Sequence, residues 1–177
     1  MDDDTRTMLK LKDGDRSAFD ELYNRFKIRV YNYILRSLGN VYMAEDLTQE
    51  VFVRMYIYAK NYEPTAKFST WLFTIATNLI INEYHKMHDT ELVESDNVQD
   101  GKPSIEEDII QKDTEHRLLE LINKLPKNQR AAIILRSYEG MDYQEIATVL
   151  KVSEKAVKSL LSRARERLLD GSKKFNL

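Results

Sequence analysis

Apolar side chains recur at helical spacing along most of this chain, and glycine and proline fall between the periodic stretches. The sequence has five glycines and three prolines in 177 residues, well under half of the roughly 12% of an average protein. Residues for tight turns are therefore scarce, and a β-rich fold is disfavoured. The first periodic stretch has i, i+3, i+4, i+7 spacing at Phe19, Leu22, Tyr23, Phe26, Val30 and Ile34.

The pattern predicts an all-α fold with two small helical domains. The first domain should cover residues 1–88 and begin with a helix that has Ser17 as its N-cap and ends at Gly39. A helix over 43–60, a loop over 61–67 and an apolar helix from Trp71 should follow. An acidic, flexible linker over 89–110 should follow. The second domain, residues 111–177, should contain four further helices, around 118–125, 131–138, 143–150 and 154–169.

Charge is distributed unevenly between these segments. The formal net charge of −2, taken alone, argues against nucleic-acid binding. Residues 1–90, however, carry 12 basic and 13 acidic side chains, whereas residues 91–110 carry one basic and seven acidic. The remaining residues, 111–177, carry 14 basic and nine acidic side chains. An acidic middle therefore masks a basic C-terminal third, and such an asymmetry indicates nucleic-acid binding.

Residues 143–162, YQEIATVLKVSEKAVKSLLS, have the spacing of a helix-turn-helix. Ala147 is small enough for close helix crossing, Ser153 can cap the second helix, and Lys151 stands where many such motifs have glycine. The apolar residues expected between the helices are Ile146, Leu150, Val152, Val157 and Leu160.

The second helix of this motif is amphipathic. At about 100° per residue, one face gathers Val157, Leu160, Leu161, Ala164 and Leu168. The opposite face carries Lys155, Lys158, Ser159, Ser162, Arg163 and Arg165. Lysine and arginine in the major groove reach guanine edges and phosphates, so we predict that these six residues contact duplex DNA.

Two blocks resemble the sigma-70 family of RNA polymerase sigma factors, in particular its small two-domain extracytoplasmic function (ECF) group. The first is AEDLTQEVFVRMY (44–56) with KFSTWLFTIATNLIINEY (67–84), and the second is the stretch 123–168. The resemblance implies a factor that binds core RNA polymerase and directs promoter-specific initiation. It would read the −35 element as duplex and the −10 element as a melted strand.

The resemblance also implies roles for individual residues of the first domain. Asp46, Gln49 and Glu50, which share one helix face, would dock on the β′ clamp helices of the polymerase. The −10 element would be contacted by the loop 61–67 and the helix behind it, at Tyr62, Lys67, Asn78, Asn82 and Lys86. There a tyrosine can stack on an unpaired base, and an amide can read base edges.

Further implied partners are the β flap, which the second domain would contact, promoter DNA, and an anti-sigma protein or another recruiting partner. The chain departs from the family where the helix from Trp71 usually carries arginines, because Thr74 and Thr77 lie within it. It departs again at Leu160, where relatives often carry arginine. Each missing phosphate contact weakens DNA binding, so we expect low intrinsic promoter affinity and recruitment through a partner.

Two alternatives stay open. An ordinary helix-turn-helix regulator would account for 143–168 but leave 44–84 unexplained. A polymerase-tethered interaction module with weak promoter affinity would account for the missing arginines.

The sequence lacks the residue patterns that are typical of enzymes, metal-binding proteins and membrane-spanning proteins. With no cysteine, no phosphate-binding glycine loop and no Ser/His/Asp arrangement, we expect no enzyme activity, cofactor or bound metal. With no apolar run long enough to span a bilayer, we expect no membrane insertion and a cytoplasmic location.

Overall fold

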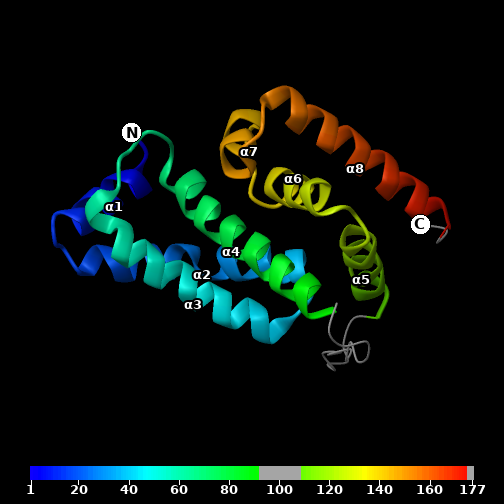
Figure 1. Ribbon diagram of the computed structural model, residues 1–177, viewed down its shortest axis with the longest axis horizontal. Helices are drawn as coiled ribbons and strands as arrows, with labels where there is room; N and C mark the ends of the chain where they lie inside the picture. The colour runs from blue at the N-terminus through cyan, green and yellow to red at the C-terminus, as the bar shows by residue number, and fades with distance from the viewer. Residues whose placement is uncertain (92–108, 175–177) are drawn as a thin grey trace.

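The computed structural model describes residues 1–91 and 109–174, and these residues form helices without any β-strand. The predicted all-α fold with two helical domains is confirmed, and the two domains pack side by side (Figure 1). The first domain contains α1 (Asp3–Lys12), α2 (Ser17–Leu38), α3 (Val41–Tyr58), the 3-10 turn η1 (Ala59–Asn61) and α4 (Phe68–Glu91). The second contains α5 (Ile109–Asn123), α6 (Lys127–Ser137), α7 (Tyr143–Leu150) and α8 (Glu154–Lys174).

The core of the first domain is aromatic. Phe26 of α2 meets Phe68 at the start of α4 with their ring centroids 5.1 Å apart, and Tyr33 meets Phe73 at 5.3 Å. The buried Tyr33 hydroxyl lies 2.8 Å from the Thr77 hydroxyl, which satisfies both groups. Burial raises the pKa of Tyr33 far above its ordinary value.

Helix boundaries differ from the prediction in places. Ser17 is the first residue of α2 rather than its N-cap: Arg16 occupies the N-cap position without a side-chain cap bond, and the Asp15 carboxylate accepts from the Ser17 amide at 3.0 Å and the Ser17 hydroxyl at 2.6 Å. At its other end, α2 stops at Gly39, as expected, which adopts the left-handed conformation with φ of 70°. The helix expected from Trp71 already begins at Phe68. Helix α4 extends to Glu91 and α5 starts at Ile109, and the rest of the predicted linker lies outside the described residues.

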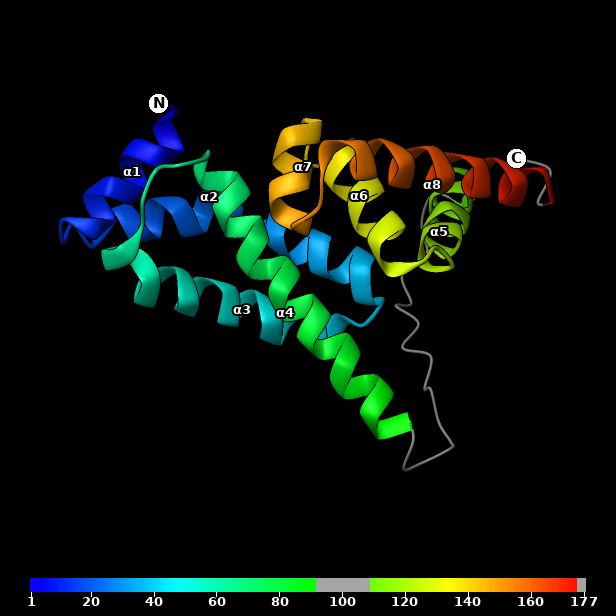
Figure 2. The ribbon, with the colours of Figure 1, turned by 45° about the horizontal axis from the view of Figure 1, so that its top comes forward.

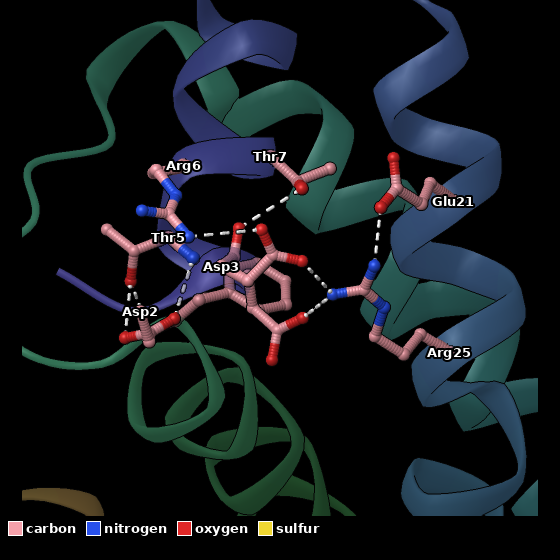
Figure 3. A network of polar contacts seen from close by, with 9 residues as sticks. Asp2, Asp3, Thr5, Arg6, Thr7, Glu21 and Arg25 are labelled. Carbon is pink, nitrogen blue, oxygen red and sulfur yellow. Dashed lines mark hydrogen bonds and ion pairs between the residues drawn. The ribbon is translucent and has the colours of Figure 1, made fainter.

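The sequence patterns did not predict α1, which packs along α2 and under the start of α4. Asp2 is its N-cap, and Met8 and Leu11 are buried in the core. Figure 3 shows that Arg25 of α2 reaches Asp3 of α1 and Glu21 of its own helix. The contact between Arg25 and Asp3 is 3.1 Å long. These contacts, with the buried apolar side chains, hold α1 against α2.

The buried apolar residues of the two domains form one continuous cluster. In the second domain, where α6 and α8 are in contact, this cluster includes Ile134 and Leu135 of α6 and Val157 and Leu161 of α8. Helix α7 lies close to α4, and α6 lies close to α2, which Figure 2 shows from a second direction. In the part of the chain that the structure describes, no helix is long and apolar enough to cross a membrane.

Candidate nucleic-acid and polymerase interface

Residues 143–162 form the helix-turn-helix that the sequence predicts, with α7 as its first helix and the beginning of α8 as its second. Asp142 and Glu145 form a capping box at the start of α7, with both amide-to-carboxylate distances at 2.8 Å. Lys151 ends α7 in the left-handed conformation, with φ of 55° and ψ of 45°. The Val152 amide then donates to the Ala147 carbonyl at 3.0 Å, which turns the chain toward α8.

Helix α8 presents the two faces that the helical wheel predicts. Val157, Leu161 and Ala164 are buried, and the Ala156 amide donates to the Ser153 hydroxyl at 3.2 Å, so the predicted cap is present. The six residues predicted to contact duplex DNA are all exposed: Lys155, Lys158, Ser159, Ser162, Arg163 and Arg165. The Lys158 amine lies 5.8 Å from the ring centroid of Tyr143, which adds an aromatic group beside this face. The exposed face of α8 is therefore polar and largely basic, with Glu166 as an exposed acidic residue.

The three residues predicted to contact polymerase lie on α3. Asp46 and Gln49 are exposed, whereas Glu50 is partly exposed and pairs with Arg54 at 2.7 Å. Beside Gln49, α2 and α3 enclose an apolar groove of about 500 Å³. Its apolar lining residues are Phe19, Tyr23, Phe52, Val53, Tyr56 and Ile57. A polar edge next to an apolar groove is the composition that protein interfaces commonly have.

The residues predicted to contact the −10 element differ in their exposure to solvent. Asn82 and Lys86 are exposed on α4, and Asn78 is partly exposed. Lys67 is exposed but pairs with Glu145 of α7 at 2.8 Å. Tyr62 is only 1% exposed and packs against Trp71 with ring centroids 5.0 Å apart. A base could stack on the Tyr62 ring only after the loop rearranged, so its role as a reader stays a prediction.

Cationic side chains line the contact between the two domains. Arg130 of α6 donates to the Ser37 carbonyl at 2.6 Å and to the Tyr84 hydroxyl at 2.8 Å. Arg29 of α2 pairs with Glu139 at 2.9 Å, and burial raises the pKa of Glu139 above its ordinary value even though Arg29 opposes that shift. The sequence patterns gave no signal for this contact, because its residues are far apart in the chain.

The loop before α4 is held by two residues that sequence reasoning missed. The Lys12 amine donates to the Tyr62 carbonyl at 2.7 Å, and the Phe68 amide donates to the Thr5 hydroxyl at 3.2 Å. A signal for α1 was available in the sequence: Asp2, Asp3 and Asp4 followed by Lys10 and Lys12 is the charge order that favours a helix.

Among the described residues there is no group of His, Cys, Asp or Glu that could hold a metal ion.

Comparison with known proteins identifies the two domains. Residues 22–88 match the model of sigma-70 region 2, and residues 115–168 match that of sigma-70 region 4. The ECF RNA polymerase sigma factor SigW of Bacillus subtilis is 32% identical over 171 residues, covering 90% of this chain and 91% of SigW. The sigma factor SigM of the same organism is 32% identical over 153 residues, covering 85% of this chain and 93% of SigM.

Solved structures agree with the fold. The structure of CnrH in complex with the cytosolic domain of CnrY has a TM-score of 0.75 and 25% identity, and covers 96% of both chains. The sigma factor RpoE from Bartonella quintana, in complex with the anti-sigma factor NepR, has a TM-score of 0.71 and 24% identity, and covers 88% of this chain and 96% of RpoE. The chain belongs to the ECF group of the sigma-70 family, and it acts with RNA polymerase in promoter-directed transcription initiation.

Proposed function

We propose that α8 reads the −35 element as duplex DNA and that α4, with the loop 62–67, reads the −10 element on a melted strand. The observation that carries the proposal is the exposed basic and hydroxyl-bearing face of α8, opposite a face buried on α6 and α7. This is the geometry in which a recognition helix enters the major groove. Along α4, the amides of Asn78 and Asn82 and the amine of Lys86 supply donors for bases and phosphates.

We also propose that α3 docks on the β′ clamp helices of core polymerase through Asp46, Gln49 and Glu50. Two observations support this: Asp46 is an exposed charge that can guide encounter, and the exposed Gln49 lines the apolar groove, whose area would stabilise the complex. The second domain would contact the β flap. The chain would thus work where core polymerase works, in the cytoplasm, and as an initiation factor rather than an enzyme.

The domain contact supports the expectation of low promoter affinity in the free chain. Lys67 is paired with Glu145, and α7 lies close to α4, so the surface proposed to read the −10 element is partly covered. If only a fraction of molecules is open, the apparent dissociation constant rises in inverse proportion to that fraction. Core polymerase would select the open form, whereas an anti-sigma protein would favour a closed one. The complex of the similar RpoE with the anti-sigma factor NepR supports the existence of such a partner.

The central experiment is transcription in vitro with core polymerase, with and without this chain, on DNA selected by the reconstituted holoenzyme. We expect specific initiation that depends on the chain. Asp46→Arg should abolish polymerase binding, whereas the neighbouring exposed Glu45→Arg is the matched charge reversal outside the predicted docking set. A chain that binds no polymerase subunit and starts no transcript would overturn the proposal.

Domain opening can be followed separately, because the chain contains no cysteine. Cysteines introduced at the exposed Thr65 and Gln144, which line the same cavity between the loop before α4 and helix α7, can carry a fluorescent donor and acceptor, one in each domain. We expect high energy transfer in the free chain and lower transfer after core polymerase is added. Low transfer in the free chain, together with tight promoter binding, would contradict the closed form.

A further inference from the structure

The loop that joins η1 to α4 is short and most of its side chains face solvent. Glu63, Pro64, Thr65 and Lys67 are exposed, and within the loop the Thr65 amide donates to the Glu63 carbonyl at 2.8 Å. An exposed loop that must place a base accurately needs support from rigid elements on either side. The structure supplies this support from α1, which the family match to residues 22–88 does not include.

At the beginning of the loop, the support is a lysine. The partly buried Lys12, the last residue of α1, directs its amine away from its own helix to the Tyr62 carbonyl, 2.7 Å away. A hydrogen bond with a charged donor is stronger and shorter than a neutral one. It therefore fixes the backbone at the point where the chain leaves η1.

At the end of the loop, the support is a threonine. Phe68 is the first residue of α4, so its amide has no partner within the helix. Lys67 cannot cap that end, because a lysine side chain has donors and no acceptor. The buried Thr5 hydroxyl accepts the hydrogen bond of the Phe68 amide at 3.2 Å. Thr5 thus provides, from another helix, the cap that the local sequence lacks.

The threonine is itself oriented by Asp2, as Figure 3 shows. Its hydroxyl donates to the Asp2 carboxylate at 2.9 Å, and its amide donates to the same carboxylate at 2.8 Å. Burial opposes ionisation of Asp2, but these hydrogen bonds outweigh it and lower the pKa of Asp2. Since a hydroxyl has one hydrogen to donate, the Thr5 oxygen is left to accept from Phe68. Helix α1 is in turn anchored to α2 by the contact between Arg25 and Asp3.

We propose that Lys12 and Thr5 are positioning residues for promoter recognition, which hold the two ends of the loop 62–67 in the geometry that reads the −10 element. The inference rests on the proposed function, in which this loop contacts the melted strand. Neither residue needs to touch DNA: each acts on the backbone of the loop.

The test compares holoenzymes made with Lys12→Met and Lys12→Arg. The readout is discrimination, the ratio of initiation on a promoter selected by the wild type to initiation on the same promoter with a scrambled −10 element. We expect Lys12→Met to lower this ratio about tenfold while polymerase affinity stays within twofold, and Lys12→Arg to restore it. Lys10→Met is the matched control, since Lys10 is exposed on the same helix. Unchanged discrimination in Lys12→Met, or loss that Lys12→Arg does not restore, would overturn the inference.

A second measurement separates this inference from the proposed function. Hydrogen exchange in the isolated chain reports the cap directly: Thr5→Val should speed exchange of the Phe68 amide at least tenfold, and Thr5→Ser should keep it slow. Fast exchange at Phe68 already in the wild type would refute the cap whether or not the holoenzyme initiates. Conversely, slow exchange in a chain that does not initiate with core polymerase would refute the proposed function and, with it, the role in promoter reading.

Discussion

The turn of the helix-turn-helix provides a quantitative test of how this motif is built. Lys151 has φ of 55° and ψ of 45°, and it is the one residue other than glycine with positive φ in the part of the chain that the structure describes. A side chain in the left-handed region costs roughly 1–2 kcal/mol. Glycine avoids this cost but loses about 0.5–1 kcal/mol more backbone entropy on folding. We therefore expect Lys151→Gly to raise the free energy of unfolding by about 0.75 kcal/mol, the middle of the roughly 0–1.5 kcal/mol that the two ranges allow.

The assay is urea unfolding of the full chain, followed by far-ultraviolet circular dichroism, with thermal unfolding as a second measure. A gain of 1 kcal/mol corresponds to a rise in Tm of about 2–4 °C for a protein of this size. Lys151→Ala is the matched control, because it removes the exposed ammonium but keeps the strained Cβ. It should stay within about 0.5 kcal/mol of the wild type, as exposed substitutions usually do. If Lys151→Gly were no more stable than Lys151→Ala, the reasoning from backbone strain would be refuted.

Three further predictions concern other parts of the molecule. Burial raises the pKa of the Glu139 carboxyl above its ordinary 4.5, so the folded chain keeps this carboxyl protonated at a higher pH than the unfolded chain does. The contribution of Glu139 to stability is therefore lost as the pH rises above 4.5. Urea titrations across this window should therefore show a flatter pH dependence in Glu139→Gln. Leu161→Ala, at a position that is 1% exposed, should lower the free energy of unfolding by about 2–5 kcal/mol. Lys155→Ala should reduce the salt dependence of duplex binding by a slope of about one.

Each of these has an outcome that contradicts it. Equal pH dependence in the wild type and Glu139→Gln would show that the carboxyl is not perturbed by burial. A loss of less than 1 kcal/mol in Leu161→Ala would show that the buried face of α8 has been assigned to the wrong residues. Unchanged salt dependence in Lys155→Ala, measured on the same duplex as the wild type, would remove that residue from the DNA surface.

Local signals in the sequence predicted much of this molecule. The helix-turn-helix was predictable because all its requirements lie within about twenty residues: a small residue at Ala147, a cap at Ser153 and an apolar face that includes Val157. The face of α8 that we propose for DNA followed from the same periodicity, since side chains three and four apart share one side of a helix. The resemblance of the two blocks to sigma factors then identified the family, which the comparisons confirm.

Only the tertiary structure determined the burial and the hydrogen bonds that depend on residues far apart in the sequence. The resemblance to sigma factors implied that Tyr62 stacks on an unpaired base, yet its ring is buried against Trp71. Lys12 and Tyr62 are 50 residues apart, and Arg130 and Ser37 are 93 residues apart, so no local pattern could pair them. Periodicity shows which face of a helix is buried, because that depends on spacing within one segment. Which distant group satisfies a free carbonyl or amide depends on how whole helices pack, and only the folded chain determines that.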